Sequence, residues 1–452
     1  MLIRFSVENY KSFKSRQVFS MAAAKHTRLK DHLVAANGKR ILKSGALFGP
    51  NASGKSNLIK AIDFARKIAL EGIRPGSISN DYFRIDSELR EKPGVFQFDF
   101  YQNGHFYSYG FAVSYLKSEF ISEWLYLVEG EREITIFERN KDSIIDTDIR
   151  FLSEDNRKRF MIYAEDAADN KSYLTEIIDH KLRSVKEFEP FFDTADWLRS
   201  LIIIFPTSRY GNIRPLMVSD TLNSMGQLLH YFDTGIESIS GDDKSMEDAL
   251  SFLSEPERDE VMTFVREALS SESEDKDHMH TLEVTIYGRK INFVKNKDGD
   301  IIGSQFLMNH GNEDDLFALA DESDGTKRLF DLLPLYKKAK QNYIIIVDEL
   351  DRSFHSKLTI EFISKFFERT RGSYTQLIVT LHDLYVMNLN LLRQDEIWFV
   401  ERKEDHSSEL YSLNKFKERF DHSVAKDYFL GRYGAVPNFG IDPWIDKTEE
   451  GD

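Results

Sequence analysis

The sequence has 452 residues, 41% of them hydrophobic, which suits a globular protein of two or three domains. No apolar run approaches the roughly 20 residues that span a bilayer, and the charged N-terminus does not have the pattern of a signal peptide, so we expect no membrane segment. The absence of cysteine excludes disulfides and thiol chemistry and fits a cytoplasmic protein.

The net charge of −15 is unevenly distributed. Residues 1–150 carry about +5, residues 151–280 about −13 and residues 281–452 about −7. An acidic middle segment is a poor surface for a nucleic-acid backbone. We interpret it either as solvated helices or as a protein-docking surface.

The first section of the chain alternates strands with one strong helix signal. Residues 2–7 alternate as a strand does, and "ILKSGALF" is followed by a glycine-bearing turn and a helical pattern. Two alternating runs, "VFQFDFY" and "HFYSYGFAV", flank Asn103 and Gly104, a dipeptide that favours a hairpin. A second hairpin is expected to turn near Gly130.

From about residue 151 the pattern becomes helical, with "LIIIFPTS" (201–208) as either a buried strand or the start of an apolar helix. The runs "IIIV" (344–347) and "QLIVT" (376–380) are typical of parallel strands buried on both faces. We therefore predict an α/β fold with a mixed sheet and a β-hairpin lobe, interrupted by a mainly helical insertion. The predicted domains are residues 1–150, 151–280 and 281–452.

The stretch "GPNASGKS" (49–56) matches G-x4-G-K-[ST] between a strand and a helix. Gly49 and Gly54 let backbone N–H groups face phosphate oxygens, and the helix N-terminus adds its positive dipole end. Lys55 is expected to reach the β- and γ-phosphates of ATP, and Ser56 to ligate Mg²⁺. The predicted nucleotide-binding residues here are Gly49, Asn51, Gly54, Lys55, Ser56 and Asn57.

Polar residues follow two of the predicted buried strands. Asp348 would hold Mg²⁺, and Glu349 would polarise the attacking water as a general base. Alone, such a pair could be two solvated acids at a strand end; together with the phosphate loop it indicates a catalytic role. His382 follows the next strand, where it is either incidental or a sensor of the γ-phosphate.

The stretch "SDGT" (323–326) stands one step before an apolar helix. A serine hydroxyl, a glycine N–H and a helix N-terminus can bind an anion, but most such turns are only helix caps. Both interpretations stay open at this point.

The ordered set "LIRFSVENYKSFK", "GPNASGKSN", "ESDGTKRL", "IIIVDELDRSFH" and "VTLHD" resembles ATP-binding-cassette (ABC) ATPases, including their SMC and RecF branch. The resemblance covers residues 1–150 and about 281–452 and implies an ABC/SMC-head-like P-loop fold. It also implies that Ser323 and Gly325 bind the nucleotide of the opposite protomer, which makes the protein at least a homodimer. Glu349 and His382 would be catalytic, and Ser56 and Asp348 would hold the metal.

More narrowly, the chain is similar to AAA-type ABC ATPases of bacterial anti-phage and abortive-infection operons. The shared features are "SDGT", "LDRSFH" (350–355) and "GRYGAVPN" (431–438). The ATPase subunit of the PARIS system, RloA-like and AbiL-like ATPases and the ATPase half of OLD-family proteins are of this kind. The resemblance implies a separate effector, a Toprim-type nuclease, and a phage-encoded trigger.

The competing class is a DNA-engaging repair ATPase of the RecF/Rad50 type, which would need a basic DNA-facing surface. The acidic residues 151–280 disfavour it. Lys11, Lys14 and Arg16 could contact nucleic acid or solvate a sheet edge. Two departures from the ABC pattern remain: Asp324 replaces a glycine of the transporter signature, and no glutamine loop can be assigned.

Overall fold

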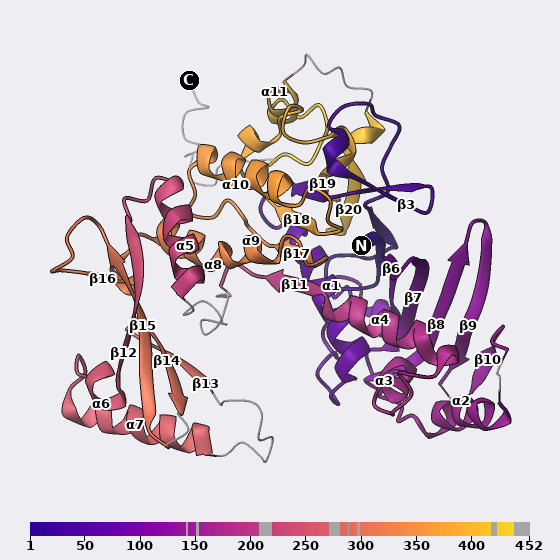
Figure 1. The fold of residues 1–452 in the computed structure, drawn as a ribbon. Coiled ribbons are helices and arrows are strands. Elements are labelled where there is room, and N and C mark those ends of the chain that lie inside the picture. Colours follow the sequence, from indigo (N-terminus) through magenta and orange to yellow (C-terminus); the bar gives the residue numbers. More distant parts are fainter. Residues whose placement is uncertain are drawn as a thin grey trace, which may run out of the picture. The chain divides into compact units, whose positions relative to one another are not determined.

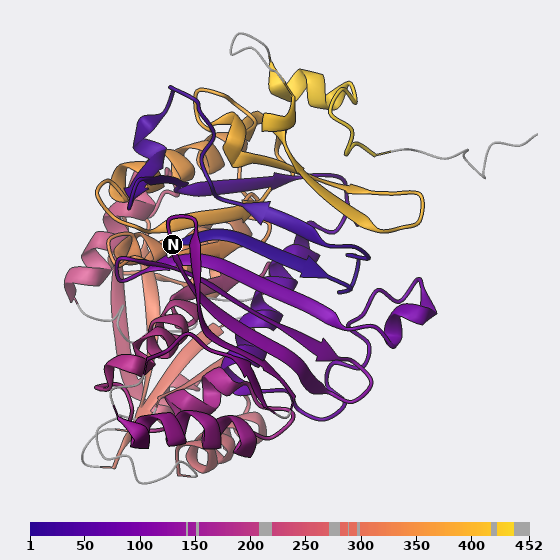
Figure 2. The same cartoon turned by 90° about the vertical axis from the view of Figure 1, so that its right-hand side faces the viewer.

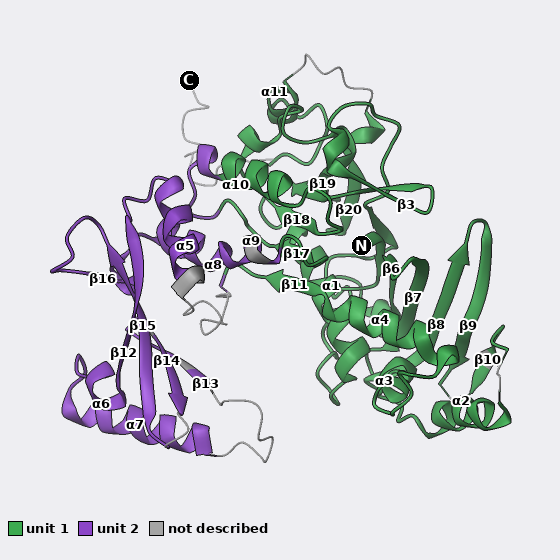
Figure 3. Cartoon of the chain, in the orientation of Figure 1, with its two compact units in different colours: residues 1–206, 339–351, 359–452 green, residues 207–338, 352–358 purple. Residues whose placement is uncertain are grey.

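The structure, a computed structural model, describes residues 1–141, 143–150, 153–207, 219–270, 281–287, 289–295, 299–416 and 423–437. The chain forms two compact units (Figure 3). Unit 1 comprises residues 1–206, 339–351 and 359–452, and unit 2 comprises residues 207–338 and 352–358. Each unit is described by itself.

Unit 1 contains a six-stranded sheet in the order β11-β17-β18-β5-β19-β20, in which only the β19–β20 pair is antiparallel (Figure 1). All side chains of β5, β17 and β18 are buried, which confirms the prediction of parallel strands buried on both faces. The strands are β5 (Ser44–Phe48), β11 (Leu201–Ile204), β17 (Ile344–Val347), β18 (Gln376–Thr380), β19 (Ile397–Arg402) and β20 (Ser408–Ser412).

The second sheet of unit 1 is antiparallel, in the order β10-β9-β8-β7-β6-β1-β2. Asn103 and Gly104 turn the β6–β7 hairpin with positive φ angles of 47° and 89°, as the sequence predicts. The strands are β1 (Leu2–Glu8), β2 (Gln17–Ser20), β6 (Gly94–Gln102), β7 (His105–Ser114), β8 (Glu119–Glu129), β9 (Arg132–Asn140) and β10 (Ile144–Asp146).

The two faces of the antiparallel sheet differ. On the inner face Trp197 stacks on Phe100 with ring centroids 4.2 Å apart, and both residues belong to the core of unit 1. Figure 2 looks onto the opposite, outer face. A separate two-stranded sheet of unit 1 pairs β3 (Leu33–Ala36) with β4 (Lys39–Leu42). The helices of unit 1 are α1 (Lys55–Glu71), α2 (Glu154–Asp166), α3 (Tyr173–Ile178), α4 (Glu189–Arg199), α10 (Ser356–Arg369) and α11 (Val424–Phe429). The first turn of α10 is assigned to unit 2.

Unit 2 is built on a small antiparallel sheet in the order β12-β15-β14-β13, with β16 beside β15. Phe293 and Leu250 belong to its own buried core. Its strands are β12 (Ser238–Ser245), β13 (Thr281–Ile286), β14 (Arg289–Lys295), β15 (Ile301–Asn309) and β16 (Phe317–Ala318); its helices are α5 (Ser219–Tyr231), α6 (Met246–Ala249), α7 (Glu255–Ser270), α8 (Asp324–Leu332) and α9 (Pro334–Lys338).

The unit boundaries differ from the three predicted segments. Residues 153–206 carry α2 to α4 and β11, which pack in unit 1 although the prediction placed them in the insertion. Residues 281–318 join unit 2 because β15 pairs with β12 along its whole length, from Ser238 opposite Asn309 to Ser245 opposite Ile302. Strand pairing between segments about 60 residues apart has no local sequence signal.

Gln376 joins the two sheets of unit 1. Its fully buried amide accepts the N–H of Leu2 at 2.6 Å and donates to the carbonyl oxygens of Leu2 and Leu42 at 2.9 and 2.8 Å. One side chain at the start of β18 thus satisfies backbone groups of β1 and β4.

We predict that Gln376→Leu destabilises unit 1 by about 3 kcal/mol, because three buried backbone groups lose their partner. The expected change in differential scanning calorimetry is a fall of about 5 °C in the Tm of unit 1. Gln102→Leu, at the partly exposed end of β6, serves as the control. Equal Tm values for the Gln376→Leu and Gln102→Leu variants would contradict the structural role of Gln376.

Candidate functional site

The loop between β5 and α1 packs closely against residues of β19 and β20. A Cβ atom on Gly49 would lie 2.3 Å from the Val400 carbonyl oxygen, and one on Gly54 would lie 2.2 Å from Ser408 Oγ. Gly54 also has φ 111° and directly precedes Lys55, the first residue of α1. The sequence therefore needs glycine at both positions, because β19 and β20 support the loop from behind.

Lys55 is buried and points back onto its own loop. Its Nζ donates to the carbonyl oxygens of Gly49 at 2.7 Å and Pro50 at 3.1 Å. Burial lowers the pKa of Lys55, and the nearby carboxylates of Asp348 and Glu349 act in the opposite direction. The ammonium group thus lies against the backbone of the loop, a position that suits the recognition of a phosphate.

Asp348 is the point where three elements meet. It follows β17 and is almost fully buried. Its Oδ1 accepts a hydrogen bond from Ser56 Oγ in α1 at 3.1 Å and one from Thr380 Oγ1 in β18 at 2.6 Å. A hydroxyl and a carboxylate at this distance are oxygen ligands of the kind that Mg²⁺ prefers, so Ser56 and Asp348 fit the predicted metal site.

Glu349 and His382 lie at the same edge of the sheet. Glu349 has a left-handed backbone with φ 50°, rare for a residue with a Cβ, and its N–H donates to Thr380 Oγ1 at 2.7 Å. The His382 Nε2 atom lies 3.9 Å from Glu349 Oε1, and both side chains are more than one-third exposed. A carboxylate and an imidazole thus face solvent beside the phosphate loop.

Asp351 holds the loop that carries His382. Its Oδ2 accepts the N–H groups of His382 at 2.7 Å and Asp383 at 2.6 Å. Its Oδ1 is buried and has no hydrogen-bond partner among the residues that the structure describes. Asp351 and Thr380 have no role in the prediction from sequence; the available signal was that they stand two residues after Glu349 and two residues before His382.

Asn57 and Asn51 differ in their surroundings. Asn57 Nδ2 donates to Ser12 Oγ at 2.9 Å, whereas Asn51 is exposed at the tip of the loop. Ser12 also supports the loop, because its carbonyl oxygen accepts the Ser408 N–H at 2.7 Å. Beside Asn57 and Ser12 opens a pocket of about 470 Å³ that Tyr82 also lines, a space suited to the remainder of a nucleotide.

Ser323 and Gly325 belong to unit 2, whereas the residues described above belong to unit 1. Ser323 is the N-cap of α8, and its Oγ accepts the Thr326 N–H at 3.1 Å. A Cβ atom on Gly325 would lie 2.8 Å from the Ser353 carbonyl oxygen, so the helix start packs tightly within unit 2. The stretch therefore forms a helix cap in unit 2.

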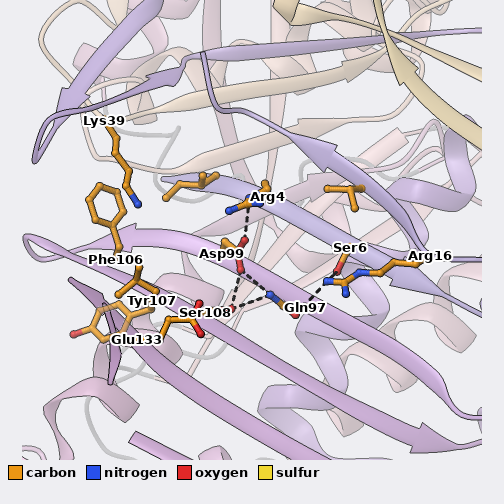
Figure 4. A pocket seen from close by; sticks show the side chains of 13 residues that line it. Arg4, Ser6, Arg16, Lys39, Gln97, Asp99, Phe106, Tyr107, Ser108 and Glu133 are labelled. Carbon is orange, nitrogen blue, oxygen red and sulfur yellow. Dashed lines mark hydrogen bonds and ion pairs between the residues drawn. The ribbon is translucent and has the colours of Figure 1, made fainter. Parts of the chain in front are cut away.

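Gln97 lies on the outer face of the antiparallel sheet (Figure 4). Its Nε2 donates to Asp99 Oδ1 and Ser108 Oγ, both at 2.9 Å. It is therefore bonded into that face and not into the phosphate loop.

A phosphate loop between a parallel strand and a helix, with an acidic pair at the end of β17, two strands along in the same sheet, is the arrangement of a P-loop ATPase fold, and it confirms the mixed α/β fold predicted from the sequence. Residues 46–388 match a protein-family model described as "AAA domain, putative AbiEii toxin, Type IV TA system". That match covers most of the sequence, and the chain belongs to this family of AAA-type ATPases.

Three solved structures of SMC heads resemble the chain. The SMC head domain from Thermotoga maritima has 13% identity and a TM-score of 0.37, covering 91% of this chain and 98% of that one. An SMC head bound to the C-terminal winged-helix domain of ScpA has 14% identity and a TM-score of 0.40, covering 94% and 99%. A Pyrococcus furiosus Smc head with an extended coiled coil, bound to the C-terminal domain of ScpA, has 13% identity and a TM-score of 0.38, covering 96% and 98%.

No curated protein matched the sequence. Among the residues that the structure describes, no helix has both the length and the apolar character needed to cross a membrane.

We predict that Thr380→Val lowers ATP turnover roughly 10- to 100-fold, because Asp348 loses a donor and the Glu349 N–H loses its acceptor. Thr380→Ser, which keeps the hydroxyl, should stay within about 3-fold of the unchanged protein. Steady-state phosphate release measures both.

Thr375→Val is the matched control, because this hydroxyl is buried just before β18 and has no hydrogen-bond partner within the described part of the chain. If Thr380→Val and Thr375→Val turned over ATP at the same rate, the hydroxyl of Thr380 would have no part in the site.

Proposed function

We propose that the protein binds and hydrolyses ATP with Mg²⁺, at sites shared between two protomers, and thereby controls a separate effector in a bacterial anti-phage defence system. The observation that carries the hydrolytic part is the geometry around Asp348. Its carboxylate contacts Ser56 of the phosphate-loop helix, while Glu349 and His382 stand next to it.

In the proposed reaction each residue has a distinct task. Lys55 and the loop N–H groups hold the phosphates of the substrate, and Ser56 and Asp348 hold the metal ion. When bound, Mg²⁺ neutralises charge that develops on the phosphate oxygens. Glu349 accepts the proton of the attacking water, and His382 contacts the transferred phosphate.

The shared site rests on Ser323 and Gly325. The N-terminus of α8 offers N–H groups to an anion, and these two residues lie in unit 2, apart in the chain from the phosphate loop. If a second protomer supplies them, hydrolysis requires assembly and the nucleotide state controls it.

The defence role is supported by the family description, which names a putative AbiEii toxin of a type IV toxin–antitoxin system. We propose that the effector is a separate Toprim-type nuclease and that a phage-encoded protein is the trigger. The segment of residues 151–280 is acidic, and the part of it in either unit is a candidate docking surface for one of them.

The RecF/Rad50-type alternative would require a long coiled coil in the Rad50 case. The longest helix among the described residues, α1, has 17 residues. Salt-dependent binding of duplex DNA by the purified protein would favour this alternative.

We predict that Glu349→Gln, which removes the proton acceptor, traps ATP and creates or locks a higher-mass assembly in the presence of ATP and Mg²⁺. Light scattering with and without nucleotide measures the mass. Adding Ser323→Arg should abolish the assembly, because a large cation replaces the hydroxyl at the start of α8.

Ser153→Arg in the same background is the control, because Ser153 caps α2 in the same way, through the Asn156 N–H at 3.1 Å. Loss of the assembly in both variants would indicate a general effect of helix-cap removal. Normal ATP turnover of the Ser323→Arg single variant would rule out the shared site.

A further inference from the structure

The outer face of the antiparallel sheet in unit 1 contains a pocket of about 270 Å³. Figure 4 shows Lys39, Arg4 and Arg16 in a row across it, above a polar group formed by Asp99, Gln97 and Ser108. The pocket lies on the face opposite the core of the unit, and the functions proposed above do not use it.

The three basic side chains of the pocket differ in their interaction partners. Arg4 pairs with Asp99 at 3.1 Å, and that carboxylate also accepts Ser108 Oγ at 2.8 Å. Arg16 is exposed and donates only to two neutral groups, over long distances of 3.3 and 3.4 Å. Lys39 lies 4.4 Å from the centre of the Phe106 ring. Glu133 also lines the pocket, so its lining carries three cations against two carboxylates, and an excess of positive charge faces a ligand.

Arg16 differs in this from the other two basic residues that the sequence analysis singled out. Lys11 pairs with Asp81 at 2.6 Å, and Lys14 pairs with Asp86 at 3.3 Å. These two cations are thus paired with carboxylates of unit 1. Arg16 instead faces the pocket.

The pocket also has an apolar wall. Ile3, Val18, Phe106 and Val128 line it, and Val18 is 39% exposed. A ligand that combines carboxylates with apolar side chains would match both parts of the lining.

The last 15 residues of the sequence, 438–452, have this chemistry and lie outside the described residues. The segment reads "NFGIDPWIDKTEEGD", with five acidic residues against one lysine. Its apolar residues stand beside its acids, as in Ile441-Asp442 and Ile445-Asp446.

The described residues that precede this segment are fixed to β19 and β20. The Ala435 N–H donates to Glu401 Oε1 of β19 at 3.0 Å, and Tyr411 of β20 donates to the Tyr433 carbonyl oxygen at 2.6 Å. β20 in turn contacts β2, where Gln17, next to Arg16, accepts the Leu410 N–H at 2.9 Å.

The segment is long enough to reach the pocket from these residues. Fifteen extended residues span up to roughly 50 Å. Crossing from β2 over β1 and β6 to β7 takes roughly 15 Å, because neighbouring strands are about 4.8 Å apart.

We propose that residues 438–452 dock in this pocket of their own chain, with their carboxylates on Arg16 and Lys39 and their apolar side chains on the wall around Val18. The proposal concerns unit 1 alone and does not depend on the proposed function.

The absence of cysteine allows a direct test in the full chain. We expect Val18→Cys combined with Ile445→Cys to give, with a short bismaleimide, an intramolecular cross-link at the mass of one chain. Lys117→Cys with Ile445→Cys is the geometric control, because Lys117 lies in the exposed turn at the far end of the β7–β8 hairpin. Mass spectrometry of tryptic peptides measures the yields.

The charge requirement is tested in the same background. Arg16→Gln with Lys39→Gln should lower the Val18 cross-link severalfold, as should 1 M salt, where the screening length falls to about 3 Å. Lys25→Gln with Lys30→Gln removes the same charge from exposed positions outside the pocket and should leave the yield unchanged.

Three results would overturn the proposal. The first is an equal cross-link yield for the Val18→Cys and Lys117→Cys variants. The second is a yield that Arg16→Gln with Lys39→Gln does not change. The third is cross-links formed only between two chains, which would assign the pocket to a second copy.

Discussion

The site depends on the alignment of parallel strands around Asp348. Val347 of β17 lies opposite Val379 of β18, and Thr380 lies opposite Leu47 of β5, so the residues after these strands meet at one edge. Asp348 can then accept hydroxyl groups from α1 and β18 together. A shift of one residue in this register would turn each side chain to the other face and separate the acidic pair from the phosphate loop.

Much of this edge could be predicted from the sequence because its signals are local. An apolar run that ends in Asp348 and a glycine loop that precedes Lys55 each lie within about ten residues. Thr380 could not be assigned in this way, because its role depends on which strand lies beside β17. The division into units escaped prediction for the same reason, since the pairing of β12 with β15 is fixed only by the folded chain.

The hydrogen bonds around Thr380 and Asp351 connect the two proposed catalytic side chains through backbone groups. Thr380 holds the N–H of Glu349 in its left-handed conformation, and Asp351 holds the N–H of His382. A left-handed backbone at a residue with a Cβ is strained and persists only where surrounding contacts hold it, and such residues are enriched at functional sites. A displacement of the His382 loop would therefore disturb Asp351, two residues from Glu349, without any change in the sheet.

The position of Asp351 in the chain gives this connection a wider consequence. The chain passes from unit 1 into unit 2 directly after Asp351 and returns to unit 1 at Thr359. Asp351, which holds the His382 loop, is therefore covalently bonded to Arg352, the first residue of a unit 2 segment. The sheets of unit 1 share one continuous core and Gln376 joins them, which leaves little room for deformation inside the unit. Asp351 thus links the His382 loop to the segment from Arg352 to Leu358. Ser353 of that segment closely approaches Gly325, which places the start of α8 at the end of the same path.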